Sequence, residues 1–144
     1  MTLRPFRRSD FSTYQQWYDD AQMNDALGPV DNAWLEYVLS ENEGKQFSML
    51  QQEELLGVAG IIWPTQLYPV HYITDLAIAP SHQGKGYGRL LIELLSKQSR
   101  PSSNVWKAFV MRNNPAGKAF FLALDWHLLD PKDSKEMLEF TSIV

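Results

Sequence analysis

Apolar side chains recur along this chain with the spacings of both helices and strands. Phe11, Tyr14 and Trp17 are spaced as on one face of a helix, and Ser9-Asp10 precede them as candidate caps. Apolar runs bounded by short polar turns, typical of buried strands, fill the middle of the chain. The pattern predicts helices and strands that share one hydrophobic core.

The expected elements follow the order β-α-α-β-β-β-α-β-α-β-β. Strands are expected at 3–6, 46–51, 55–63, 70–79, 105–111, 126–129 and 137–141. Helices are expected after Ser9-Asp10, after Asp31-Asn32 and up to Gly44, at 84–99, and at 115–124 after an Asn114 cap. The strand–helix–strand unit implies a parallel pair and the hairpins imply antiparallel pairs. The fold class is therefore α/β (α+β), with a mixed central β-sheet flanked by helices.

Composition narrows the class of protein. The chain has 144 residues, 44% of them hydrophobic, which suits a single domain over 1–144. It has no Cys, the N-terminus lacks the apolar segment of a secretory signal, and no run is long enough to span a membrane. A soluble, cytoplasmic protein is expected.

The net charge of −4 argues against a nucleic-acid partner. His71, His82 and His127 are isolated, so no metal site is expected.

A glycine-led segment is the most informative part of the chain. An apolar strand, Tyr72 to Ala79, runs into the turn Pro80-Ser81-His82 and then into Gly84, Gly86 and Gly88. A helix start presents unpaired backbone N–H groups and partial positive charge. Glycines let a bulky anion approach those groups closely. The segment therefore predicts a site for a phosphate-bearing ligand.

Two common nucleotide motifs do not fit this segment. The dinucleotide pattern G-x-G-x-x-G fails because Arg89 stands where its last glycine would be. A P-loop ending at Gly84-Lys85 would need glycine at position 79, which is Ala79. A Ser-His-Asp hydrolase is equally unsupported, because no G-x-S-x-G occurs.

The spacing Gln83-x-x-Gly86-x-Gly88, with the lead-in Leu76 to Pro80, resembles the signature of the GCN5-related N-acetyltransferase (GNAT) family. The order of expected elements is also similar to that family over most of the chain. The resemblance implies the acyl-CoA N-acyltransferase fold and transfer of an acetyl group from acetyl-CoA to a primary amine. It places the cofactor contacts at Leu76, Ala77, Ile78, Gln83, Gly84, Lys85, Gly86, Tyr87, Gly88, Arg89, Asn114 and Phe121.

A second segment, from Asn114 to Trp126, is similar to the family's other signature, N-x-x-A-x-x-F-Y-x-x-x-G-F. Gly117 replaces a small residue and Asp125 replaces a glycine that ends the helix. Phe121 replaces the tyrosine that the family often uses to protonate the departing CoA thiolate. Phenylalanine has no proton to donate, so slower catalysis is expected. Core packing is the alternative role of Phe121, and helix capping that of Asn114.

The sequence does not identify the general base of this reaction. Asp75 is the only carboxylate on the expected fourth strand and is the candidate catalytic residue, with a structural hydrogen-bonding role as its alternative. Thr74 and Tyr72 are candidates to order a water molecule instead, and Glu36 is a more distant one.

The acceptor is a small-molecule or peptide amine that the sequence does not identify. Its pocket is expected along Asn24 to Asp31 and Trp63 to Pro69, which carry apolar and aromatic side chains. Two other functions stay open: an acyl-CoA-binding sensor without turnover, and a transferase that uses another acyl-CoA. The strand at 137–141 is a candidate edge for pairing in a homodimer.

Overall fold

The computed structural model describes residues 1–19, 30–129 and 137–143. The strands are β1 (Thr2–Pro5), β2 (Gly44–Gln51), β3 (Glu54–Ile62), β4 (His71–Ile78), β5 (Val105–Met111), β6 (His127–Leu128) and β7 (Met137–Ile143). The helices are α1 (Phe11–Trp17), α3 (Asn32–Ser40), α4 (Tyr87–Ser96) and α5 (Pro115–Ala123), with short 3-10 turns η1 (Arg8–Asp10) and η2 (Pro80–His82).

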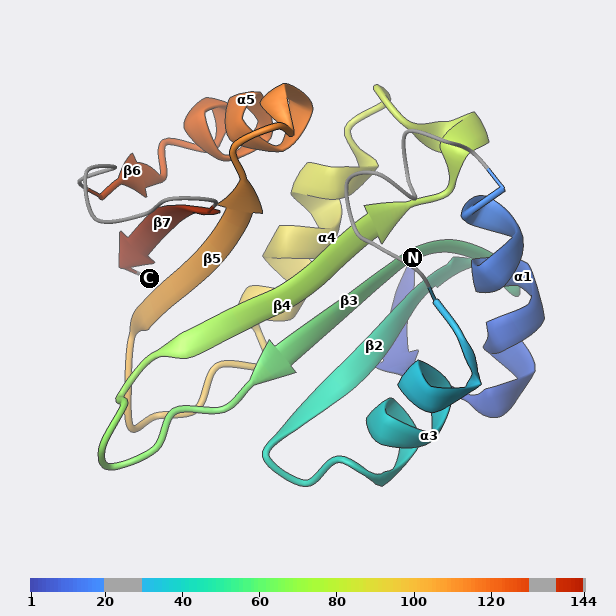
Figure 1. The fold of residues 1–144 in the computed structure, drawn as a ribbon, viewed down its shortest axis with the longest axis horizontal. Coiled ribbons are helices and arrows are strands. Elements are labelled where there is room, and N and C mark those ends of the chain that lie inside the picture. Colours follow the sequence, from blue (N-terminus) through green and yellow to red (C-terminus); the bar gives the residue numbers. More distant parts are fainter. Residues whose placement is uncertain (20–29, 130–136, 144) are drawn as a thin grey trace. The chain divides into compact units, whose positions relative to one another are not determined.

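The strands form one mixed sheet in the order β1-β2-β3-β4-β5-β7-β6 (Figure 1). β1 pairs with β2 antiparallel, whereas β4 and β5 run parallel. The predicted fold class and the predicted parallel pair are thus confirmed. No helix of the described residues is long and apolar enough to cross a membrane.

Two compact units divide the chain, and each is described by itself. The first contains residues 1–61 and 75–98, and the second contains residues 62–74 and 99–144.

In the first unit, an aromatic core lies around α1. Tyr14 is only 1% exposed, and its ring packs edge-to-face on Phe6, Trp17 and Tyr18. Trp34 of α3 packs against the same ring at 5.2 Å. The helical spacing of aromatic side chains in the sequence therefore marks a face that is truly buried.

The residues before α1 differ from the prediction. Asp10 makes no side-chain cap of α1. Its carboxylate instead accepts hydrogen bonds from the Arg4 guanidinium at 2.7 and 2.9 Å, from the Arg7 N–H and from Ser48. Burial alone would raise the pKa of Asp10, but these donors and the Arg4 charge leave that pKa below its ordinary value. Asp10 therefore caps the short turn η1 rather than α1, and its ion pair with Arg4 holds the chain just before this helix.

α3 begins where the sequence predicts. The Asp31 carboxylate accepts a 2.9 Å hydrogen bond from the Trp34 N–H, as an N-cap does. The expected end at Gly44 is wrong, because the helix stops at Ser40 and Gly44 opens β2.

The predicted hairpin is present. β2 and β3 are joined by Gln52 and Glu53, both with positive φ (50° and 70°). Two successive left-handed residues match the twist of a tight hairpin. Further along β3, Gly57 packs closely: a Cβ there would lie 3.1 Å from side-chain atoms of Ile78 and Leu91. β4 and α4 therefore lie against β3 at this point.

In the second unit, β5 is flanked on both sides. Its parallel pairing with β4 joins His71 to Trp106 and Ile73 to Ala108. Its antiparallel pairing with β7 runs over the whole of both strands. β7 is not the outermost strand, because β6 pairs with it at Phe140 and Thr141. The candidate dimer edge is thus covered at these two residues.

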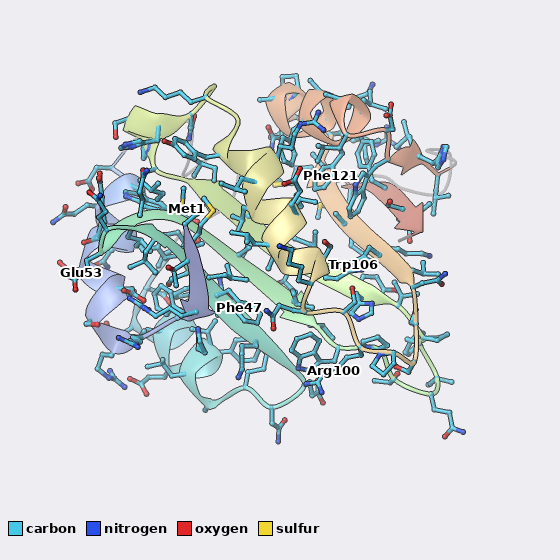
Figure 2. All side chains as sticks on the ribbon, turned by 180° about the vertical axis from the view of Figure 1, so that it is seen from behind. Met1, Phe47, Glu53, Arg100, Trp106 and Phe121 are labelled. Carbon is cyan, nitrogen blue, oxygen red and sulfur yellow. The ribbon has the colours of Figure 1, made fainter. Side chains whose placement is uncertain are left out.

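Buried aromatic groups link the strands of this unit to its loops. The His71 ring is fully buried and stacks on Trp106, 4.5 Å between centroids. Trp63 contacts the same ring edge-on, and the Arg100 guanidinium lies 4.2 Å above Trp63. Figure 2 shows Arg100 in the loop leading into β5 and Trp106 on that strand. Trp63 thus takes part in packing here, and residues 24–29 of the other expected pocket segment lie outside the described residues.

Candidate functional site

The turn that follows β4 is tied back to the strand. Side-chain Nε2 of Gln83 donates a 3.1 Å hydrogen bond to the carbonyl oxygen of Ile78. Between them, η2 begins with Pro80, and Nε2 of His82 at its end lies 3.8 Å from a carboxylate oxygen of Glu54 of β3. His82 is therefore half-buried and contacts β3.

The two glycines that precede α4 adopt left-handed backbone conformations. Gly84 has φ +76° and Gly86 has φ +87°, a region that costs other residues about 1–2 kcal/mol. A Cβ at either position would have no atom within 4 Å. The glycines are therefore required by backbone conformation, and the space above the turn is open to a ligand.

The helix is shorter than the sequence predicts. α4 spans Tyr87–Ser96 rather than 84–99, and Gly86 is its N-cap. Left-handed φ values cannot belong to an α-helix, so Gly84 and Gly86 form the turn and only Gly88 is helical. The glycines thus build the approach to the helix.

The start of α4 has the groups that an anion requires. The first helical hydrogen bond runs from the Leu90 N–H to the Gly86 carbonyl at 3.2 Å. The amides of Tyr87, Gly88 and Arg89 precede that bond, at the positive end of the helix dipole. Lys85 and Arg89 are exposed and add positive charge to the same turn. Backbone donors, open space and positive charge coincide here.

Ala77 and Ile78 are buried, and Leu76 is half-buried, at the end of β4 that leads into this turn. The Ala79 N–H donates to the Leu56 carbonyl at 2.9 Å, which holds the end of β4 against β3. In the first unit, the expected strand contacts and the glycine turn are therefore consecutive parts of one segment, which hydrogen bonds join to β3 and to itself.

Asp75 lies just before this segment, in a polar cluster within the first unit. Its Oδ2 atom accepts a 2.7 Å hydrogen bond from Gln46 Nε2. The Tyr14 hydroxyl lies 3.5 Å from the same oxygen, and the Tyr18 hydroxyl lies 2.9 Å from that of Tyr14. The structural hydrogen-bonding role considered for Asp75 is therefore present.

The environment of the cluster keeps both tyrosines protonated. Burial, reinforced by the charge of Asp75, raises the pKa of Tyr14 well above its ordinary value. Burial raises the pKa of Tyr18 to about 12, and the smaller effect of Asp75 acts in the same direction. The hydrogen bond between the two hydroxyls partly opposes the shift at Tyr18.

Sequence reasoning did not assign a role to this cluster beyond Asp75. Tyr14 and Tyr18 satisfied the helical pattern as aromatic residues, and their hydroxyl groups played no part in it. Gln46 is the residue from which this cluster could have been predicted. It is a polar residue at an inward position of an apolar strand, only 4% exposed, and buried polar groups require partners.

α5 of the second unit begins with the predicted cap. The Asn114 Oδ1 atom accepts a 3.0 Å hydrogen bond from the Gly117 N–H, and Pro115 occupies the first turn. The glycine at 117 has a steric reason. A Cβ there would lie 2.7 Å from Asn114 Nδ2 and 2.9 Å from a Val110 methyl group.

The helix ends at a left-handed Asp125, with φ +63°. The Trp126 N–H then donates to the Phe121 carbonyl at 3.1 Å. Asp125 therefore takes the conformation for which the resembling signature has glycine.

Phe121 is buried on α5, where Figure 2 labels it. Its ring lies 4.9 Å from Trp126, 5.1 Å from Phe120 and 5.5 Å from Phe140. The packing role considered for this residue is therefore present in the second unit.

The remaining candidates for the base have other contacts. Tyr72 stacks on Phe109, with 5.8 Å between ring centroids. Glu36 forms a surface ion pair with Arg8 at 2.9 Å. Thr74 is exposed on β4. Among the described residues, no group of three or more metal-ligating side chains is placed to hold a metal ion.

Comparison with known families identifies the family of the chain over most of its length. Residues 5–126 match the Acetyltransferase (GNAT) family. The chain belongs to this family. Membership supports an acyltransferase, and the glycine turn lies inside the matched region. No curated protein sequence shows significant similarity to the chain.

Solved structures share the fold at low sequence identity. An acetyltransferase from Thermus thermophilus has a TM-score of 0.83 at 18% identity, covering 100% of this chain and 98% of that one. A spermidine N-acetyltransferase from Vibrio cholerae, in complex with CoA and spermine, has a TM-score of 0.76 at 18% identity, with 99% and 94% covered.

A third similar structure is an acetyltransferase from Salmonella typhimurium that modifies the N-terminal serine of ribosomal protein L7/L12. Its TM-score is 0.80 at 15% identity, with 99% and 94% covered. At such identities the likeness establishes the fold alone. Spermidine and a ribosomal protein are acceptors of those proteins, and fold does not determine the acceptor.

Proposed function

We propose that this protein is an N-acetyltransferase that moves the acetyl group of acetyl-CoA to a primary amine by direct attack within a ternary complex. The observation that carries the proposal is the left-handed turn at Gly84 and Gly86, with open space above it, leading into α4 in a chain of the GNAT family. Such a turn suits the pyrophosphate of coenzyme A.

The donor contacts in the first unit follow from this turn. Backbone amides from Gly84 to Arg89 would bind the pyrophosphate, and Lys85 and Arg89 would add charge. Gln83, hydrogen-bonded to Ile78, would hold the turn in shape. The backbone of Leu76 to Ile78 would pair with the acetyl and pantetheine amides.

Asn114 and Phe121 belong to the second unit. Their assignment as donor contacts rests on the resemblance of the second signature. Asn114 already caps α5, and Phe121 already packs among three rings. A cofactor contact would be an additional role for each.

The chemistry requires a neutral amine, an electrophilic thioester and a stable leaving group. A base must remove the proton of the acceptor ammonium before nitrogen attacks the thioester carbon. A backbone N–H of β4 would stabilise the oxyanion that develops. The thiolate leaves without help from Phe121, since a thiol pKa of about 8.5 makes it a tolerable leaving group near neutrality.

The experiment combines binding and turnover on the full chain. Thermal unfolding is measured with acetyl-CoA, propionyl-CoA and succinyl-CoA, and thiol release is then followed with polyamines, amino acids and peptide N-termini. A rise in melting temperature with acetyl-CoA is expected from linkage, together with thiol release by one amine class. No rise with any acyl-CoA would overturn the proposal.

Phe121 favours a second candidate, an acyl-CoA-binding sensor without turnover, because this buried side chain offers no proton. A rise in melting temperature without thiol release for any amine supports the sensor. Faster release from a larger acyl-CoA than from acetyl-CoA would instead assign a different donor.

A further inference from the structure

The carboxylate of Asp75 is held by a buried side-chain amide. Nε2 of Gln46 donates a 2.7 Å hydrogen bond to Oδ2 of Asp75. An ionised carboxylate only accepts hydrogen bonds, so the amide nitrogen of Gln46, and not its oxygen, must face it. The bond is shorter than the usual N–H···O distance of about 2.9–3.0 Å, as expected when the acceptor carries a charge. Gln46 thus fixes one oxygen of this carboxylate.

Gln46 is itself held in place through its side chain and its backbone. It lies on β2, and only 4% of it is exposed. Its carbonyl oxygen accepts a 2.9 Å hydrogen bond from the N–H of Phe6, a residue of the buried core. Close-packed neighbours leave such a side chain little freedom to turn away from its partner. Gln46 is therefore a fixed donor for Asp75.

Two members of the polar cluster are partly exposed. Asp75 and Tyr18 are half-buried, whereas Tyr14 is 1% exposed and Gln46 is 4% exposed. Burial raises the pKa of Tyr18 to about 12, so its hydroxyl keeps its proton near neutrality and is not a base there. An ionised carboxylate has the lone pairs and the negative charge that receive a proton. Of these four residues, Asp75 is thus the one that combines exposure with basic character.

Asp75 also adjoins the strand segment that is proposed to bind the acyl group. It directly precedes Leu76 on β4, so the two Cα atoms are about 3.8 Å apart. Asp75 and the segment from Leu76 to Ile78 both belong to the first unit. A base must reach the attacking nitrogen directly or through one water molecule. Asp75 carries the only carboxylate of β4, and it lies at the edge of this segment.

We propose that Asp75 takes a proton from the acceptor ammonium and that Gln46 is the positioning residue that holds the carboxylate for this step. The inference rests on the proposed acetyl transfer. The ammonium N–H bond breaks, its electron pair stays on nitrogen, and the proton binds a carboxylate oxygen of Asp75. The neutral nitrogen attacks the thioester carbon, and the carbon–sulfur bond breaks. One further proton moves from nitrogen to the departing sulfur, so the products are an amide, a thiol and a protonated Asp75 that returns its proton to water.

The charged groups of the neighbouring elements have partners of their own or are exposed. α1 carries no charged side chain. Tyr14 and Tyr18 of α1 stay protonated near neutrality, because burial raises the pKa of both. Arg4 of β1 and Arg8 of η1 are each paired with an acidic side chain, and Lys45 of β2 is exposed. The loss of activity at low pH should therefore report the carboxylate that Gln46 holds.

The test follows thiol release by the full chain across pH, with the amine that wild type acetylates fastest. Asp75→Asn keeps the size of the side chain but cannot take the proton. Its kcat near neutral pH should fall about 10²- to 10⁴-fold. The loss should shrink as pH approaches about 10.4, where a primary amine no longer needs a base. The rise in melting temperature with acetyl-CoA should equal that of wild type, because the donor contacts are intact.

Gln46→Met isolates the positioning role, because methionine has a similar length and no amide. Without the hydrogen bond the carboxylate protonates more readily, so the fall of kcat on the acid side should move up by about 1–2 pH units. Gln46→Glu places a second carboxylate beside the first, and two carboxylates in one site retain a proton, so the fall should move further up. Gln51→Met is the matched control, since it makes the same substitution at an exposed position of the same strand. It should keep the wild-type profile.

The outcomes separate the base from its positioning residue. An Asp75→Asn rate equal to wild type, or reduced by the same factor at every pH, would overturn the assignment of Asp75. A Gln46→Met profile that is lowered without a shift toward higher pH would show that Gln46 only supports the fold. If Gln46→Met does not fold, the same comparison in Gln46→Glu decides. No thiol release by wild type with any amine overturns the proposed function itself, whereas equal release by wild type and all variants overturns only this inference.

Discussion

The Nε2 atom of His71 accepts a 2.8 Å hydrogen bond from the backbone N–H of Arg100. The other ring nitrogen, Nδ1, lies 3.2 Å from the Val105 carbonyl oxygen and must carry the proton to bond it. These two partners fix one neutral tautomer. A single side chain of β4 thus bonds the Arg100 N–H in the loop before β5 and the carbonyl of Val105, the first residue of β5.

His71 should make the protein acid-sensitive. Burial is the largest cause that holds its pKa below the ordinary value, and the nearby Arg100 charge acts in the same direction. The unfolded chain therefore binds a proton more readily as pH falls below about 6.5, so stability that is complete above that pH is lost below it. Unfolding free energies from urea titrations at several pH values should show this slope.

Two variants isolate the histidine. His71→Phe keeps a ring to stack on Trp106 but leaves two backbone groups unpaired, at about 1–3 kcal/mol for each. It should flatten the acid slope. His127→Gln, at an exposed position of β6, should leave the slope unchanged. A wild-type slope that survives in His71→Phe would contradict this prediction.

Gly86→Asn should cost less stability than Gly86→Ala, and both substitutions should weaken binding of the acyl donor. Gly86→Ala places a Cβ on a left-handed residue at about 1–2 kcal/mol, while asparagine occupies that region more readily. Both side chains enter the open space above the turn, where the pyrophosphate is proposed to lie. The melting-temperature rise with acetyl-CoA should shrink in both, and an undiminished rise in Gly86→Asn would contradict the proposed site.

The sequence could predict local structure at the candidate site where residue type and backbone geometry are tightly linked. The glycines at 84 and 86 adopt positive φ, and Asn114 caps α5, because few residues serve those positions. The predicted extent of α4 was wrong for the same reason: glycine is compatible with both a helix start and a turn, and only the φ values decide between them.

Side chains that meet across long sequence separations were beyond sequence reasoning. Asp10 fits a helix cap by local rules, yet Arg4 and Ser48 bind it instead. The polar cluster brings together Tyr18 and Asp75, which lie 57 positions apart, and nothing local in either segment indicates these contacts. Tertiary contacts override local preference at such places.

Phe121 should matter more to stability than to donor chemistry. Its buried ring touches three other aromatic rings, so Phe121→Ala should lower the free energy of unfolding by about 3–5 kcal/mol. Leu122→Ala changes the next residue, which is 46% exposed, and should stay within about 0.5 kcal/mol. Chemical denaturation of both variants measures the difference, and equal losses would show that the ring cluster contributes little.

Asn114 allows capping and cofactor contact to be separated. Asn114→Ala removes the acceptor for the Gly117 N–H and should cost about 1 kcal/mol of stability, whereas Asn114→Ser retains a capping oxygen and should cost less. The two variants differ in the cap but share the loss of the amide. If Asn114 only caps, the melting-temperature rise with saturating acetyl-CoA should be the same in wild type and Asn114→Ser. If its amide also binds the donor, as the family resemblance implies and as we expect, that rise should be smaller in Asn114→Ser although the protein stays nearly as stable. Thermal unfolding across an acetyl-CoA titration distinguishes these outcomes, because linkage converts a weaker affinity into a smaller rise at each concentration.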